Sequence, residues 1–366
     1  MRGIAQIFTG GYDAPLYTAD TIIARLREIT ESMTIDKVIV GWYPDEALYR
    51  PIGEFLHARG IEMFLWLPVF SETSDLVPMK AAVDLKGEPL TKAIEQQGEN
   101  FIFSCPSSLD NLKAVCGVYE THFSECGFDG VFLDRIRTQS FVGGVEGVLS
   151  CGCADCRAAY AERGVSLDEI AALYEEKGDA FFDVTAFSPS GEMTFADERV
   201  ARFFDAKGEI VAQSVRILSR YFREGGLKIG LDVYAPLMSR FVGQCYPLLA
   251  KEADFIKPML YRRTKAPAGM MYEYDLFHVC APTASGYPEL TADDALLRAQ
   301  TTPLAVLPCA VYAGIEVNFN AVIAPTDATY VRESVAVLEE CGMDGVTLSW
   351  DAMQAPDDHL RAACGI

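Results

Sequence analysis

Short runs of apolar, β-branched residues alternate along the chain with stretches in which apolar positions recur every three or four residues. The first pattern is typical of buried strands and the second of amphipathic helices. The predicted strands cover residues 4–8, 37–42, 61–67, 130–133, 228–233, 255–260, 304–311 and 345–349. Predicted helices lie between them, among others over residues 19–33, 109–126 and 328–341.

Strands separated by helices or long crossovers pair in parallel, and strands that are apolar throughout have both faces covered. The pattern therefore predicts an α/β fold of the (β/α)₈ TIM-barrel type, which needs about 250 residues. The chain has 366 residues and is predicted to form a single domain over 1–366. A largely helical segment over 138–226 is predicted as an insertion after the fourth strand. A doubly wound open sheet is the main alternative, although no strand is followed by the phosphate-binding G-x-G-x-x-G motif.

Acidic side chains give the chain a formal net charge of -21, from 52 acidic and 31 basic residues. Such a surface disfavours nucleic acid and anionic membranes as partners. The 11 cysteines are spread along a chain whose start does not resemble a secretory signal, so we expect reduced thiols and a cytoplasmic location. The sequence leaves the oligomeric state open, with a homo-oligomer as one alternative.

Acidic residues recur where predicted strands end. They are Asp134, Asp232 and Asp351 directly after strands, Glu316 four residues past the seventh strand, and Asp13 in the first loop. In TIM barrels the carboxyl ends of all strands meet at one mouth, where catalysis takes place. Glycoside hydrolysis needs two carboxyl groups, one as proton donor and the other as nucleophile or base. Structural ion pairs are the alternative explanation for some of these acids.

Aromatic and basic side chains are expected at the same mouth. All three tryptophans, Trp42, Trp66 and Trp350, close predicted strands, and the candidates for substrate binding also include Tyr12, Tyr261, Arg135 and Lys257. Flat aromatic faces suit the C–H patches of sugar rings, although aromatic residues are also common in strands for packing reasons. The guanidinium of Arg135 is expected to keep Asp134 ionised, as a nucleophile requires.

The segment Phe128-Asp129-Gly130-Val131-Phe132-Leu133-Asp134-Arg135-Ile136-Arg137 resembles the fourth-strand signature DG(I/V)xLDxxR of glycoside-hydrolase-like TIM barrels. Ser104-Cys105-Pro106 resembles their CP element, and residues 254–261 resemble their sixth-strand signature. These barrels are distantly similar to the α-amylase and α-galactosidase clans. The resemblance implies a nucleophile at Asp134. The α-amylase pattern has a glutamate acid/base where this chain has the shorter Asp232.

Three cysteines, Cys151, Cys153 and Cys156, form a C-x-C-x-x-C cluster at the start of the predicted insertion. Three thiolates supply three of the four ligands of a tetrahedral structural Zn²⁺, and Cys105 is a spatial candidate for the fourth. Reduced thiols without metal are the alternative. Catalysis itself is expected to need no cofactor.

These features predict a hydrolase that acts on a small oligosaccharide or glycoside. The retaining mechanism is favoured, with Asp134 as nucleophile and Asp232 or Glu316 as acid/base. A lyase or aldolase that forms a Schiff base on Lys257 is a second hypothesis, since that lysine lies on the sixth predicted strand. A carbohydrate-binding barrel without turnover is the third.

Overall fold

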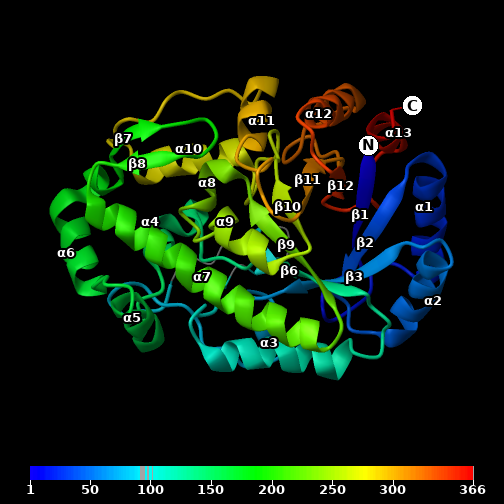
Figure 1. The fold of residues 1–366 in the computed structure, drawn as a ribbon, viewed down its shortest axis with the longest axis horizontal. Coiled ribbons are helices and arrows are strands. Elements are labelled where there is room, and N and C mark those ends of the chain that lie inside the picture. Colours follow the sequence, from blue (N-terminus) through cyan, green and yellow to red (C-terminus); the bar gives the residue numbers. More distant parts are fainter. Residues whose placement is uncertain (91–94, 97–98, 101, 366) are drawn as a thin grey trace.

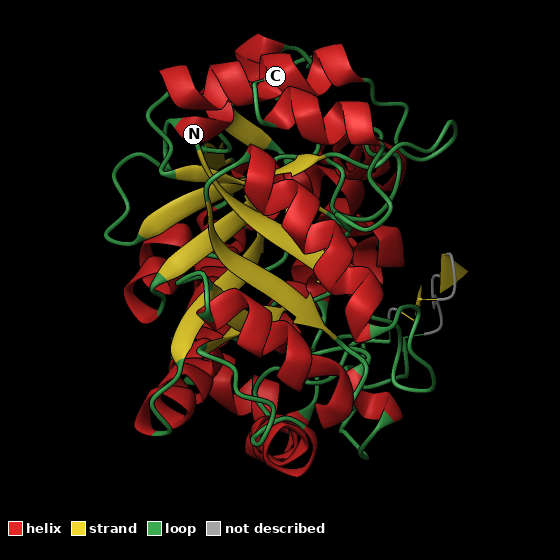
Figure 2. Ribbon diagram, turned by 90° about the vertical axis from the view of Figure 1, so that its right-hand side faces the viewer, coloured by secondary structure: helices red, strands yellow, loops and turns green. Residues whose placement is uncertain are grey.

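Eight parallel strands close into a barrel at the centre of the molecule, and helices surround it (Figure 2). The structure, a computed structural model, describes residues 1–90, 95–96, 99–100 and 102–365. Around the barrel the order is β1-β12-β11-β10-β9-β6-β3-β2. These strands are β1 (Arg2–Phe8), β2 (Ile35–Gly41), β3 (Glu62–Pro68), β6 (Gly130–Asp134), β9 (Lys228–Tyr234), β10 (Phe255–Met259), β11 (Ala310–Glu316) and β12 (Gly345–Ser349). The TIM-barrel prediction is confirmed.

Helices cover the outside of the barrel and form much of the segment between β6 and β9 (Figure 1). They are α1 (Ala19–Ser32), α2 (Glu46–His57), α3 (Leu109–His122), α4 (Gly144–Leu149), α5 (Ala154–Ala161), α6 (Leu167–Lys177), α7 (Glu198–Glu224), α8 (Pro236–Ser239), α9 (Tyr246–Leu249), α10 (Met270–Cys280), α11 (Asp294–Thr301), α12 (Ala328–Glu340) and α13 (Asp357–Ala363). Two short antiparallel pairs join β4 (Glu95–Gln96) to β5 (Glu99–Asn100) and β7 (Val184–Phe187) to β8 (Met193–Phe195). No helix in the described ranges is long and apolar enough to cross a membrane.

The seventh barrel strand begins later than the sequence pattern predicts. The apolar run that starts at Leu304 belongs first to the turn after α11, where the Leu304 N–H donates to the Thr301 carbonyl. Val306 in that turn is exposed. The strand itself pairs with β10 from Ala310 onward and with β12 up to Glu316. Glu316 is therefore the last residue of β11, and its predicted place four residues beyond the strand is wrong.

Large and small side chains alternate inside the barrel. A Cβ at Gly130 would lie 2.3 Å from the Phe64 ring, and one at Gly230 would lie 2.3 Å from the Phe255 ring. The glycines therefore make room for aromatic rings on neighbouring strands, which fill the interior below the mouth. Such filling makes the barrel a packed core and not a channel.

The chain between β6 and β9 departs furthest from a regular barrel unit. It contains α4, α5, α6 and the β7–β8 hairpin before the long helix α7 returns along the barrel (Figure 1). Asp197 caps α7 by accepting from the Arg199 N–H, and the helix contacts α3 and β9. Phe203 and Phe204 on α7 are buried in the core.

Candidate active site

Asp134 and Asp232 lie side by side at the mouth of the barrel. Strands β6 and β9 pair in register from Gly130 with Lys228 to Leu133 with Leu231, so the next step along β6 brings Asp134 beside Asp232. Side chains alternate along a strand, and both acids share the inward face with the interior residues two positions earlier, Phe132 and Gly230. Asp134 is 8% exposed and Asp232 is 3% exposed.

Two hydrogen-bond donors and a guanidinium group lie around Asp134 in the described structure. The indole Nε1–H of Trp66 donates to its Oδ2 over 2.9 Å, and the backbone N–H of Arg135 donates to its Oδ1. The Arg135 Nε lies 3.8 Å from Oδ2. Hydrogen-bond donors and a cation around a carboxylate fix the direction in which it points.

Aromatic rings flank this carboxylate on the side of β1, β2 and β3. Trp42 and Trp66 are edge to face, with ring centroids 5.8 Å apart, and Phe8 packs against Trp42 at 5.0 Å. Tyr12, in the loop after β1, lies 6.1 Å from Trp42. On the opposite side of the mouth Tyr261 and Trp350 are 6.2 Å apart. The structure thus places all three tryptophans at one mouth.

Arg135 forms an ion pair with Glu72 from the loop after β3. The guanidinium also donates to the Ser71 hydroxyl over 3.0 Å and lies 5.1 Å from the Trp42 ring. Both partners have left-handed backbone, with φ of 54° at Arg135 and 61° at Glu72. This conformation is unfavourable for residues with a Cβ and persists where surrounding contacts enforce it.

Asp232 pairs with Lys257 of β10, its register partner on the neighbouring strand. The Lys257 Nζ lies 3.1 Å from Asp232 Oδ2, and neither side chain is more than 3% exposed. Burial raises the pKa of Asp232 to about 7; the Lys257 ammonium opposes this shift and the Asp134 carboxylate adds to it. Asp232 can therefore both hold and release a proton near neutral pH.

Glu316 lies at the end of β11, and both of its carboxylate oxygens accept hydrogen bonds. Its Oε1 accepts from the backbone N–H groups of Arg263 and Thr264, at 2.7 and 3.1 Å, and its Oε2 accepts from the Tyr330 hydroxyl at 2.6 Å. Tyr330 belongs to α12, outside the barrel. Glu316 therefore connects the loop after β10 to α12.

The two remaining predicted acids differ from the central pair. Asp351 accepts backbone N–H bonds from Phe8 and Met353, and burial raises its pKa to about 6. Asp13 is exposed in the loop after β1. Neither forms a hydrogen bond or ion pair with Asp134 or Asp232 in the part of the chain that is described.

Sequence reasoning missed two charged groups at the mouth, Glu72 and Glu273, and noted Arg137 only as a basic residue that follows Asp134. Glu72 lies in an irregular loop, where only its position after a strand offered a signal. Arg137 packs between the Phe103 and Tyr234 rings, with its guanidinium carbon 4.6 and 4.5 Å from their centroids. Glu273, on α10, accepts from Ser140 and Tyr234 and is buried.

Four cysteines converge beside this mouth. The Sγ atoms of Cys105, Cys151, Cys153 and Cys156 all lie within 4.8 Å of one another. The Cys105 Sγ lies 3.3 Å from that of Cys153 and 3.5 Å from that of Cys156. Cys105 precedes α3, so the cluster joins two loops that are distant in sequence. No disulfide is formed by these residues.

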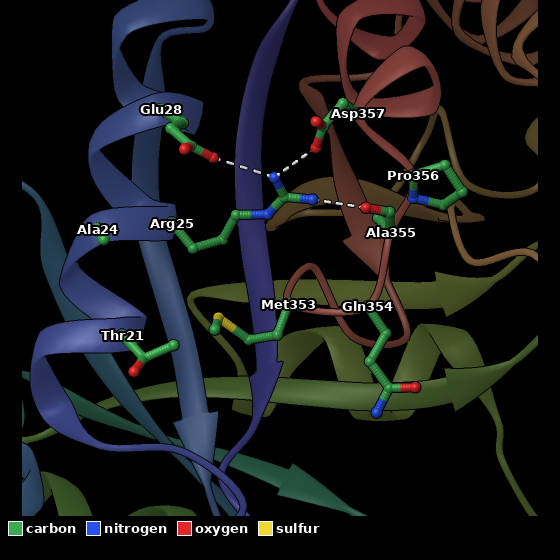
Figure 3. Close-up of a pocket in the computed structure, with 9 residues that line it drawn as sticks. All are labelled: Thr21, Ala24, Arg25, Glu28, Met353, Gln354, Ala355, Pro356 and Asp357. Carbon is green, nitrogen blue, oxygen red and sulfur yellow. Dashed lines mark hydrogen bonds and ion pairs between the residues drawn. The ribbon is translucent and has the colours of Figure 1, made fainter.

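A separate groove of about 490 Å³ lies outside the barrel, between α1 and residues 353–357 (Figure 3). Arg25 crosses it and donates to Glu28, Asp357 and the backbone carbonyl of Ala355. The groove contains none of the carboxylates of the mouth, so its size does not make it the catalytic centre.

Known structures share this fold. The glycoside hydrolase domain of PgaB (BpsB) from Bordetella bronchiseptica has a TM-score of 0.60 at 15% sequence identity, covering 99% of this chain and 98% of that one. Alpha-L-fucosidase isoenzyme 2 from Paenibacillus thiaminolyticus has a TM-score of 0.56 at 11% identity, covering 100% of this chain and 48% of that one. No family model matches the chain, and no curated protein matches its sequence. The similarity establishes the barrel fold.

Proposed function

We propose that the chain is a glycoside hydrolase with Asp134 and Asp232 as its two catalytic carboxyl groups. The observation that carries the proposal is the pairing of these buried acids on adjacent inward-facing strand ends. Their environments differ in the way the reaction requires, since Asp134 is surrounded by donors and Asp232 has a raised pKa. The barrel shared with PgaB and the fucosidase supports the same reaction class.

In this proposal Asp134 is the nucleophile and Asp232 the acid/base of a retaining mechanism. Neighbouring strands lie about 4.8 Å apart, which favours the short separation of about 5–5.5 Å found in retaining pairs over the longer one of inverting pairs. Glu316 is less suited to the acid role because both of its oxygens accept hydrogen bonds from the loop after β10 and from α12.

The proposed substrate is a small oligosaccharide or glycoside. Trp42 and Trp66 on one side and Trp350 and Tyr261 on the other offer aromatic faces for sugar rings. The Arg135–Glu72 pair supplies polar contacts for sugar hydroxyls. Asp13, which is exposed in the loop after β1, is proposed to contact the substrate at the rim of the mouth. Asp351 is proposed to support the end of β1 by accepting a hydrogen bond from the Phe8 N–H.

Hydrolysis of a panel of nitrophenyl glycosides tests this function, with Asp134→Asn as the diagnostic variant. Loss of the nucleophile is expected to lower kcat by at least about 10³-fold while the thermal unfolding curve is retained. The control is Asp110→Asn, an exposed acid at the start of α3. Full activity of Asp134→Asn contradicts the assignment. Sugar binding at the mouth without any turnover would support the binding-barrel alternative.

The Schiff-base hypothesis for Lys257 is disfavoured by its ion pair. Burial acts to lower the pKa of Lys257, but Asp232 and Tyr261 outweigh it and the net shift is upward. A Schiff base requires the neutral amine. Borohydride trapping with carbonyl compounds tests this hypothesis, and a covalent adduct on Lys257 would revive it.

We also propose that Cys105, Cys151, Cys153 and Cys156 hold a structural Zn²⁺. At a Zn–S distance of about 2.3 Å, tetrahedral ligands lie about 3.8 Å apart, which fits sulfurs that are all within 4.8 Å. Lys207 is buried near these thiols: its Nζ donates to the Thr138 hydroxyl over 3.3 Å, and burial lowers its pKa to about 7 while Cys156 and Cys151 oppose that shift. Reduced thiols at such a site agree with the proposed cytoplasmic location.

Metal analysis of the purified protein tests the zinc proposal. One equivalent of zinc is expected, and Cys105→Ser is expected to lower both zinc content and the melting temperature. Cys364→Ser, at a half-buried cysteine outside the cluster, is the matched control. A metal-free protein whose melting temperature is unchanged by added zinc would overturn the proposal.

A further inference from the structure

Lys257 is a buried lysine in the barrel wall. Lysine is rarely buried in proteins unless it is paired with an opposite charge. Its side chain is 1% exposed, and its Nζ lies 5.9 Å from the Phe132 ring centroid and 5.2 Å from that of Tyr261. Burying an ammonium group is costly unless it is paired and hydrogen-bonded. The charge partner that the structure gives it is Asp232, at 3.1 Å.

The neighbouring strand leaves space for this lysine. A Cβ at Gly314 of β11 would lie 2.7 Å from the Lys257 Cε and 3.4 Å from the Ser349 Oγ. Any larger residue at position 314 would therefore push the ammonium away from its present place. The sequences of β9, β10 and β11 thus fit together around one ion pair.

The ion pair with Lys257 occupies one carboxylate oxygen of Asp232 and leaves the other oxygen without a hydrogen-bond donor in the described structure. Oδ2 accepts from Lys257, whereas Oδ1 is buried and has no hydrogen-bond partner within the described ranges. Asp134 lies on the strand on the other side of Asp232, away from β10. Oδ1 is therefore the oxygen left for exchanging a proton with a ligand at the mouth.

We propose that Lys257 is the positioning residue of the reaction, because its ammonium holds Asp232 by Oδ2 and leaves Oδ1 as the oxygen that donates the proton. This inference rests on the proposed glycoside hydrolysis and deepens it. As Asp134 bonds to the anomeric carbon, the glycosidic C–O bond breaks with its electron pair on oxygen, and that oxygen takes the Asp232 proton. Water then gives its proton to Asp232 and its oxygen to the anomeric carbon, which releases Asp134. Lys257 keeps its own proton throughout.

The charged and titratable groups that act on Asp232 come from several elements. Lys257 and Arg137 favour its ionised form, and Asp134 disfavours it. The Tyr261 hydroxyl interacts with both Lys257 and Asp232, and burial raises the pKa of Tyr261 to about 12. Tyr246 on α9 is a further neighbour, and it stays protonated because burial raises its pKa. Removal of the Lys257 charge must therefore raise the pKa of Asp232.

The test compares Lys257→Met and Lys257→Arg with the wild type. The titration of Asp232 is followed by NMR in protein with ¹³C-labelled aspartate, and Asp232→Asn identifies its signal. In Lys257→Met the midpoint is expected to rise by about one pH unit or more, because a close opposite charge is lost. In Lys257→Arg the Asp232 midpoint is expected to stay close to the wild-type value, because the guanidinium keeps the positive charge. Lys251→Met, at an exposed lysine, is the control.

Kinetics on the best glycoside give a second readout. The basic limb of kcat/KM is expected to move to higher pH in Lys257→Met, together with the NMR midpoint. Misdirection of the proton donor should lower kcat by about 10–100-fold on alkyl glycosides and less on nitrophenyl glycosides, whose leaving groups need little protonation. Gly314→Ala displaces the ammonium without removing it. Its kcat and the basic limb of its kcat/KM profile are therefore expected to lie between those of the wild type and of Lys257→Met.

An Asp232 midpoint that is unchanged in Lys257→Met, or a shift of equal size in Lys251→Met, overturns the inference. If Lys257→Met does not fold, an unchanged midpoint in Gly314→Ala overturns it instead. If the wild type hydrolyses no glycoside, the proposed function fails, but the titration still decides whether Lys257 controls Asp232.

Discussion

Two buried acids end strands of the same barrel, and their surroundings separate their roles. Asp232 at the end of β9 has one oxygen bonded to Lys257 and the other without a partner in the described structure. Glu316 at the end of β11 has both oxygens occupied by donors from the neighbouring loop and from α12. Burial raises the pKa of both. The candidate acid/base Asp232 and the structural residue Glu316 therefore share a strand-end position and a raised pKa. They differ in that Asp232 has one carboxylate oxygen without a hydrogen-bond partner in the described structure, whereas both oxygens of Glu316 accept hydrogen bonds.

Within this comparison, the largest expected effect is that of Asp232→Asn on turnover. An amide cannot donate the proton, so kcat on alkyl glycosides is expected to fall by about 10²–10⁴-fold. The amide oxygen can still accept from Lys257, but the buried ammonium loses its charge partner, so a lower melting temperature is expected as well. Activity is measured per folded molecule beside Glu316→Gln. Equal losses in the two variants would remove the distinction between the two acids.

Glu316→Gln is expected to change stability more than catalysis. The amide keeps one acceptor oxygen and brings an N–H₂ group against backbone and hydroxyl donors, which costs about 1–3 kcal/mol in the free energy of unfolding. Urea denaturation measures this difference, with Glu333→Gln on the exposed face of α12 as control. A stable Glu316→Gln variant that lacks activity would instead place Glu316 in the reaction.

The smallest expected effect concerns Asp351, a further buried acid, which follows the end of β12. Its pKa in the folded state is raised to about 6, above the value in the unfolded chain. It therefore contributes stability that is present below about pH 4 and is lost as pH rises through 6, with a size of about 3 kcal/mol.

Denaturation of the wild type and Asp351→Asn at pH 4.5 and pH 7.5 measures this contribution. The wild type is expected to lose more stability than the variant between the two pH values. If the free energy of unfolding changes by the same amount in both proteins, Asp351 does not titrate between pH 4.5 and pH 7.5.

Much of the fold was predictable because periodicity is a local property. The run over residues 38–42 is apolar on both faces, and this occurs in strands that are covered on both sides. The boundary of β11 was not predictable, because the turn at Leu304 is as apolar as a strand and only pairing with β10 separates the two.

The sequence by itself determined the order of strands and helices, the acids at the strand ends and the cysteine spacing, since each is written in the spacing of residues along the chain. The tertiary structure decided which acids meet. Closing the sheet set Asp134 beside Asp232, brought Cys105 to the other three thiols and turned Glu316 to α12. Those outcomes depend on strand register and on loops far apart in sequence, because contacts across a barrel are fixed by how the strands pair and not by local pattern.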